Sequence, residues 1–247
     1  MAITSYSKFD TYKSKIFSLS SPIEEEALLS SQFLLEKDDK KKLEIYYAPF
    51  DYVNEQAKIV IVGITPGLHQ MKRSYETVRN LRDNKVTDEE ILHQVKKNSS
   101  FEGPMRKNLI KMLDELQLHQ YLGLSSTSEL FNTASHLVQT TSIITYPVFY
   151  NGKNYNGSVP NLLKTELLKK YVMENFTSEL KKLQDALIIP LGVNVTNALT
   201  FLAENDYMNP SAVLFGFPHP SGGNGHRHKQ FAENKENMKQ NIQAYFD

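Results

Sequence analysis

The chain has 247 residues, with 28 Lys and Arg against 28 Asp and Glu, and it contains neither cysteine nor tryptophan. Its length suits one α/β domain with a substantial core. The missing cysteines exclude disulfides, cysteine nucleophiles and thiolate-held iron–sulfur clusters, and the zero net charge argues against binding nucleic acid by charge alone.

We predict a single domain over residues 1–247, of which about 1–44 form an N-terminal extension. No apolar core of a signal peptide occurs between Met1 and Lys15, and the longest apolar runs are far shorter than a membrane span. The sequence therefore predicts a cytoplasmic protein that has no membrane partner.

Strands and helices are expected to alternate after the extension. The run Ile59–Val62 is apolar at successive positions, which indicates a strand covered on both faces, as in a parallel sheet. Asn151-Gly152 indicates a tight type I′ hairpin within 146–155. Strands are expected at 45–50, 58–64, 130–131, 186–191 and 212–215, and helices at 87–97, 104–118, 162–173, 177–183, 195–204 and from 229. This alternation predicts an α/β fold with a mostly parallel sheet.

Two segments are placed where such sheets bind ligands, after the carboxyl ends of strands. Gly63-Ile64-Thr65-Pro66-Gly67 follows the most apolar strand and predicts a tight turn with accessible amides, although an ordinary βα turn has the same composition. The second segment, 217–227, fixes His219 between two prolines and continues through Ser221, several glycines and a basic cluster. Alternatively, residues 217–227 form only a glycine-rich surface loop.

Together these two loops resemble the signature loops of the uracil-DNA glycosylase superfamily, which are a Gly-x-(Asp/Asn)-Pro-(Tyr/Gly) loop and a His-Pro-Ser loop. The run 187–192 is similar to the third core strand of that family, which ends in a Gly before a helix. The resemblance runs from about Lys58 to Phe246. It implies a three-layer α/β/α fold with a central, mostly parallel four-stranded sheet.

The resemblance also implies an activity, the hydrolysis of the N-glycosidic bond of a uracil or modified pyrimidine flipped out of DNA. His219 matches the residue that donates to the leaving base, and Thr65 stands where the family orients the attacking water. The residues implied in base binding are Gly63, Ile64, Pro66, Gly67, Phe101, which would stack on the base, and Asn132, which would read its edge. The residues implied in phosphate binding are Ser221, Gly222, Gly223, Asn224 and Arg227.

The chain departs from the family's pattern at several positions. Thr65 replaces the usual Asp or Asn and cannot act as a carboxylate base. Gly67 replaces the Tyr that excludes thymine in the strict uracil branch, so the first motif is closer to the mismatch-specific and single-strand-selective branches. Gly222 follows Ser221 where Pro is common. Branches with an iron–sulfur cluster are excluded, and no metal or other cofactor is expected.

Three alternatives remain open at this point. The chain could be a catalytically weak or inactive glycosylase fold that binds nucleic acid or nucleotides, or a glycosylase for bulky modified bases, such as those of phages. A metal hydrolase with His219, His226 and His228 as ligands lacks a compact ligand spacing. We expect the protein to be a monomer that binds DNA. A local basic rim would suffice for this binding in spite of the zero net charge. Its members would be Lys72, Arg73, Lys96, Lys97, Arg106, Lys107 and residues 226–229.

Overall fold

A parallel sheet lies at the centre of the fold. The computed structural model of the chain describes residues 7–82, 85–183 and 185–247, so residues 1–6 of the expected N-terminal extension lie outside it. Strand β3 (Ile59–Gly63) runs between β4 (Val138–Ser142) and β7 (Leu187–Pro190), and both pairs are parallel. The predicted α/β class is confirmed.

The expected fourth strand at 212–215 is present in the described chain only as one parallel bridge between Ile188 and Val213. A 3₁₀ turn at Pro210–Ala212 precedes the bridge, and Gly216 follows it with a φ of 92°. These two features leave only a short extended segment between them, so the pairing ends after one residue.

The side chains of β3 alternate between two cores because successive residues of a strand face opposite sides of the sheet. Ile59 and Ile61 pack with helices α5 (Pro104–Glu115) and α10 (Arg227–Phe246), whereas Val60 and Val62 pack with α9 (Val193–Glu204). All five residues of β3 are buried, as expected for the middle strand of a covered sheet.

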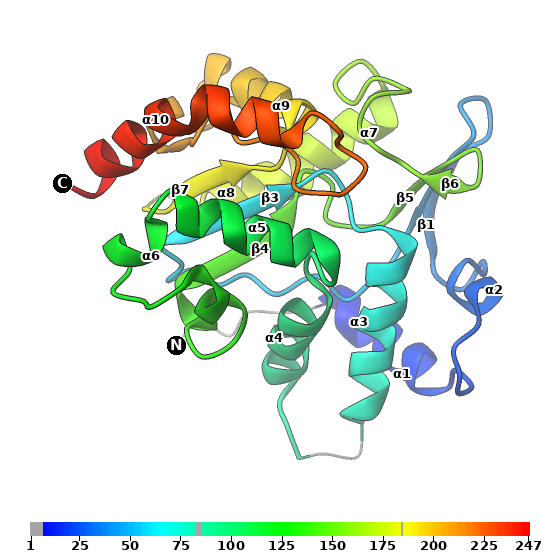
Figure 1. Cartoon of the computed structure of the whole chain (residues 1–247). Coiled ribbons are helices and arrows are strands. Elements are labelled where there is room, and N and C mark those ends of the chain that lie inside the picture. The colour runs from blue at the N-terminus through cyan, green and yellow to red at the C-terminus, as the bar shows by residue number, and fades with distance from the viewer. Residues whose placement is uncertain (1–6, 83–84, 184) are drawn as a thin grey trace.

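A second, antiparallel sheet stands beside the first (Figure 1). Its strand order is β1 (Leu34–Asp38), β2 (Leu43–Tyr46), β5 (Val148–Tyr150) and β6 (Lys153–Asn154). The predicted hairpin is confirmed, since it joins β5 to β6 through Asn151 and Gly152, both with positive φ (51° and 70°).

The N-terminal region is packed into the rest of the molecule. Helices α1 (Ser7–Phe17) and α2 (Glu25–Leu28) precede β1. Phe9, Ile16 and Phe33 have no exposed surface and belong to the same buried cluster as Val60 and Ile188.

The remaining helices cover the sheets or join their strands. They are α3 (Leu68–Asn80), α4 (Asp88–Ser99), α6 (Leu118–Tyr121), α7 (Glu166–Tyr171), α8 (Thr177–Leu180), a π-helical turn at Val172–Phe176 and 3₁₀ turns at Thr127–Phe131 and Ser135–Leu137. The first of these 3₁₀ turns replaces the strand expected at 130–131. Within the described ranges, every helix is too short or too polar to cross a membrane.

Candidate functional site

A cavity of about 570 Å³ opens at the carboxyl ends of β3, β4 and β7. This is the end of a parallel sheet at which ligands bind in α/β folds. Gly63 ends β3, Ser142 is its register partner on β4, and Gly192 follows β7. All three residues line the cavity, together with both loops predicted from the sequence.

The first loop is attached to the antiparallel sheet through Thr65. The Thr65 hydroxyl donates to the carbonyl oxygen of Tyr146 (2.7 Å) and accepts from the amide of Val148 (3.1 Å). Its only hydrogen is therefore already used, and it could offer a water molecule no more than an acceptor lone pair. The main contacts of Thr65 hold the loop in place.

Gly67 caps helix α3 and does not line the cavity within the described chain. Its amide donates to Gln70 Oε1 (2.6 Å), and the next amide, of Leu68, donates to Asn154 Oδ1 (2.9 Å). A Cβ at position 67 would lie 3.0 Å from Gln70 Oε1 and 3.4 Å from Asn154 Nδ2. Gly67 stands where the strict uracil branch has a Tyr, and Gln70 and Asn154 fill the space next to it.

Phe101 forms one wall of the cavity and is held in an unusual backbone conformation. Its φ is +54° and its side chain is buried, which is rare for a bulky residue and marks a constrained position. A Cβ at Gly63 would lie 3.2 Å from Phe101 Cε1, so the glycine allows the ring to lie directly against the end of β3.

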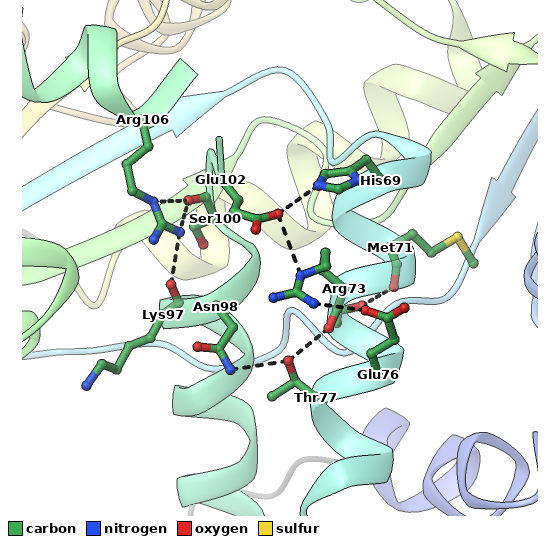
Figure 2. Close-up of polar contacts among 11 residues, drawn as sticks. His69, Met71, Arg73, Glu76, Thr77, Lys97, Asn98, Ser100, Glu102 and Arg106 are labelled. Carbon is green, nitrogen blue, oxygen red and sulfur yellow. Dashed lines mark hydrogen bonds and ion pairs between the residues drawn. The ribbon is translucent and has the colours of Figure 1, made fainter. Parts of the chain in front are cut away.

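A polar network fixes the segment that carries Phe101 (Figure 2). Glu102 pairs with His69 Nε2 (2.7 Å) and Arg73 Nε (3.6 Å), both from α3. On the other side, Arg106 donates to the carbonyl oxygens of Ser100 (3.0 Å) and Lys97 (2.9 Å). Charged groups on both flanks therefore hold the turn at Phe101.

His219 also lines the cavity, and the second loop determines its tautomer. The backbone N–H of Ser221 donates to His219 Nδ1 (3.3 Å), and the Ser221 hydroxyl lies 2.9 Å from the same nitrogen. Nδ1 is therefore an acceptor, and the neutral ring carries its hydrogen on Nε2. Burial lowers the pKa of His219, which favours this neutral form.

Three side chains brace the second loop, one from α5, one from the loop itself and one from the start of α10. Arg227 donates to the Ser221 carbonyl oxygen (2.6 Å), Asn108 to that of Pro220 (2.8 Å) and Asn224 to that of His219 (3.2 Å). Gly192 (φ +88°) allows the loop to approach β7, because a Cβ there would lie 2.8 Å from His219 Cβ.

The structure brings most of the predicted site residues together. Within the described chain, the cavity is lined by Gly63, Ile64, Thr65, Pro66, Phe101, His219, Ser221, Gly223 and Asn224, but not by Gly67, Gly222, Arg227 or Asn132. Gly222 is exposed beside the lining residues, and Arg227 points back into its own loop.

The placement expected for Asn132 is wrong. The segment before it is a 3₁₀ turn rather than a core strand, and the strand that reaches the cavity, β4, begins only at Val138. Asn132 is exposed, and its amide donates to Ser128 (3.2 Å). The β4 residues 140–142 line the cavity instead.

Several lining residues were not found from the sequence. Asn156 and Ser158 follow the hairpin, and Asn194 Nδ2 ties them to α9 by donating to Asn156 O (3.1 Å) and Ser158 Oγ (2.9 Å). Ser99 comes from the last turn of α4, and so does Lys96, which the sequence assigned only to the basic rim. Long-range packing brings these residues to the site, and no local motif marks them.

Buried charges lie beside the cavity, around Lys96. Lys96 Nζ donates to the Thr140 carbonyl oxygen (2.9 Å). Asp51 accepts from the hydroxyls of Tyr47 and Tyr146 (both 2.8 Å), and burial raises its pKa. Glu179 accepts from Gln139 Nε2 (2.7 Å) and Thr141 Oγ1 (2.9 Å). The wall beside β4 is therefore polar and charged.

Fewer residues contribute positive charge to the basic rim than the sequence predicted, because three of the side chains are buried or already bonded. Lys96 is buried, Arg106 is occupied with backbone carbonyls, and Arg73 is paired with Glu76 and Glu102. In the part of the chain that the structure describes, no group of three His, Asp or Glu side chains could hold a metal ion. The histidine cluster considered as a metal site is therefore not formed there.

Comparisons with known proteins identify a family and one similar protein. The model of the uracil DNA glycosylase superfamily matches residues 50–246. The chain is similar to an uncharacterized protein, YoxB, of Bacillus subtilis (strain 168), with 39% identity over 236 residues that cover 95% of this chain and 91% of the relative. No solved structure matches the chain.

Proposed function

Because the chain belongs to the uracil DNA glycosylase superfamily, we propose that it is a monofunctional DNA glycosylase that hydrolyses the N-glycosidic bond of a flipped uracil or modified pyrimidine. The observation that carries the proposal is the tautomer of the His219 ring. Its Nδ1 accepts from Ser221, so its Nε2–H is free to donate inside a cavity at the end of the sheet.

The proposed reaction places charge at opposite ends of the breaking bond. The base leaves as an anion while the sugar becomes cationic, and a water molecule then adds hydroxide to the sugar carbon and its proton to the base. A donor aimed at a base oxygen stabilises the transition state more than the ground state, because the oxygen gains charge as the bond breaks. His219 Nε2–H is the proposed donor.

The other residues are proposed to hold the substrate. The Phe101 ring stacks on the base against Gly63, with Ile64 and Pro66 on the same wall. Ser221, Gly222, Gly223 and Asn224 offer hydroxyl, amide and backbone N–H donors to phosphates beside the flipped nucleotide. Arg227 adds positive charge and braces this loop.

Thr65 is proposed to assist the attacking water only through an acceptor lone pair. Its hydroxyl hydrogen is given to Tyr146, and the family's carboxylate or amide is missing at this position. We therefore expect base departure, and not activation of the water, to provide most of the rate acceleration.

A cavity of about 570 Å³ is within the range of sites for drug-sized ligands, which supports including modified pyrimidines in the proposal. The alternative of a binding module without catalysis keeps the same cavity and differs only in whether the bond breaks. The proposal needs one copy of the chain, no metal and no cofactor, and it places the activity in the cytoplasm.

An oligonucleotide assay tests the proposal. The protein is incubated with labelled single- and double-stranded oligonucleotides that carry uracil or a series of modified pyrimidines, and abasic sites are then cleaved with alkali. Strand breaks are expected for at least one base, unaffected by EDTA, and His219→Ala should reduce them about 100-fold or more. Tight binding without breaks would favour the binding module, and activity that depends on added zinc would contradict the proposal.

A further inference from the structure

Four exposed lysines gather at one end of the antiparallel sheet, where two of its turns meet (Figure 1). Lys40, Lys41 and Lys42 lie in the turn between β1 and β2, and Lys153 follows the turn between β5 and β6. The amide of Asn151 donates to the carbonyl oxygen of Lys42 (3.0 Å), so the two turns are direct neighbours. We call these four lysines the lysine tip.

The acidic side chains near the lysine tip already have partners. The ion pairs are Glu36 with Lys170 (3.1 Å) and Asp39 with Lys37 (2.7 Å). Asp38 accepts from the backbone amide of Lys41 (3.0 Å), and Glu44 lies opposite Lys37 in the strand register. The four lysines of the tip make no ion pair with any residue that the structure describes. At this end of the sheet, positive charges therefore outnumber negative ones.

The β5–β6 hairpin connects the lysine tip to the cavity. The amide of Val148, the first residue of β5, is bonded to Thr65 of the first loop, and β6 leads into Asn156, which lines the cavity. Asn151 in the turn is three positions after Val148, which is about 10 Å at the rise of a β-strand. The tip therefore stands about 10 Å from the first loop.

This distance suits a contact with DNA whose reacting nucleotide lies in the cavity. A duplex advances about 3.4 Å per base pair, so about 10 Å corresponds to about three base pairs. Lysines that meet backbone phosphates at this distance add affinity without reading sequence, because the phosphates are the same at every position.

The cavity itself supplies few cations for this purpose. Lys96 is buried, Arg106 is bonded to backbone carbonyls, and Arg73 is paired with Glu102. Extruding a nucleotide from a duplex costs about a few kcal/mol of stacking and pairing, and contacts with the flanking DNA offset this cost. A neutral protein needs a local source of positive charge for such contacts.

We propose that the lysine tip is a second DNA contact, which binds backbone phosphates about three base pairs from the flipped nucleotide and on one side of it only. This inference rests on the proposed function and adds an interaction surface to it. Three of the four lysines precede residue 50, where the match to the family model begins. The surface therefore lies mostly outside the part of the chain that the family shares.

The experiment moves one binding site along a duplex of constant length. Duplexes of about 20 base pairs carry a tetrahydrofuran abasic-site analogue at the centre, or about two base pairs from one end or the other, so that either flank is too short to reach the tip. Dissociation constants are measured by fluorescence anisotropy at several salt concentrations.

Three proteins are compared in this assay. They are the wild type, a tip variant with Lys40→Gln, Lys41→Gln and Lys153→Gln, and a control variant with Lys58→Gln, Lys181→Gln and Lys239→Gln. Both variants have the same net charge, and none of the three control lysines lines the cavity. Lys42 is kept because its φ of +54° makes a substitution there a change of backbone strain as well as of charge.

We expect the wild type to bind one end-placed duplex about tenfold more weakly than the other, and the tip variant to lose this difference. The salt dependence of log Kd should become shallower by about 2–3 in the tip variant, because each lost phosphate contact lowers the slope by about 1. The control variant should keep the difference between the two placements. A wild type that binds both equally, or variants that change alike, would overturn the inference.

Excision of uracil from the centre of the same duplex is measured in parallel, and binding to the analogue requires no bond cleavage. A wild type that excises no base but distinguishes the two placements disproves the proposed function and leaves the second contact standing. A wild type that excises uracil but binds the end-placed duplexes equally disproves the second contact alone.

Discussion

At His219, a neighbour two positions along the chain selects which ring nitrogen carries the hydrogen. The Ser221 N–H points at Nδ1, so protonation of that nitrogen would set two donors against each other. The sequence indicates the histidine because two prolines flank it, but it does not reveal the tautomer, which depends on the path of the loop.

The pH dependence of excision should reflect this arrangement. Burial lowers the folded-state pKa of His219 from the ordinary 6.5, so the ring stays neutral as the pH falls through 6.5 and is protonated only at lower pH. By linkage, the stability that His219 contributes is present above 6.5 and is lost below it. We expect the acid limb of the single-turnover rate to have its midpoint below pH 6.5. A midpoint at or above 6.5 would contradict the assignment of a neutral donor.

The sequence suggests that Thr65 replaces the family's water-orienting side chain with a less effective group. The structure shows that Thr65 also holds the first loop in place. The hydroxyl joins the first loop to Tyr146 and Val148, more than 80 positions along the chain. This role could not be predicted, because no local pattern indicates which distant backbone a hydroxyl will meet.

Replacing Thr65 should therefore affect stability as well as rate. Thr65→Val keeps the shape but leaves the Tyr146 carbonyl and the Val148 amide without this partner, and we expect a loss of about 1–3 kcal/mol in the free energy of unfolding. Thr65→Ser retains the hydroxyl and is the matched control, expected to lose less than about 1 kcal/mol. Urea unfolding of both variants measures the difference, and equal stability would show that these hydrogen bonds contribute little.

At the scale of elements, short sequence motifs correctly predicted the elements whose conformation is determined mainly by neighbouring residues. The capping box at Thr87 correctly predicted the start of α4, and Asn151-Gly152 the hairpin. The strands expected at 130–131 and 212–215 were wrong or reduced to one bridge, because apolar runs this short fit several conformations and tertiary packing decides among them.

The junction between β7 and α9 sets the position of the second loop. Gly192→Ala places a Cβ 2.8 Å from that of His219 at a φ of +88°, so the loop or the helix must move. We expect the excision rate to fall about 10- to 100-fold, since a displacement of about 1 Å can have that effect. Gly225→Ala in the same loop, where a Cβ meets open space, is the control. Similar rates for both variants would show that the contact does not position His219.

At the scale of the whole molecule, the N-terminal region is part of the core although the family match begins at residue 50. Phe9, Ile16 and Phe33 are fully buried in a cluster that also contains side chains of both sheets. The sequence suggested an extension over about 1–44 because it shows no family motif, and motifs report on the site rather than on packing.

Truncation of this region should unfold the protein. Phe33→Ala removes a fully buried ring, and we expect a loss of about 3–5 kcal/mol in the free energy of unfolding, with deletion of residues 1–44 giving an insoluble product. Tyr207→Ala, at a side chain that is 43% exposed, should change stability by less than about 0.5 kcal/mol. A soluble, active fragment beginning at residue 45 would disprove the structural role of this region.

The bonds from Thr65 and Leu68 to the antiparallel sheet have a consequence for the motions of the site. Two of these bonds connect the first loop to the chain before and within β5, and the third connects the start of α3 to β6. The loop therefore cannot separate from the hairpin without breaking all three, and the two segments form one cooperative opening unit. In native-state hydrogen exchange, the amides of Leu68 and Val148 should become labelled together, at a rate that reports how often the first loop separates from the hairpin.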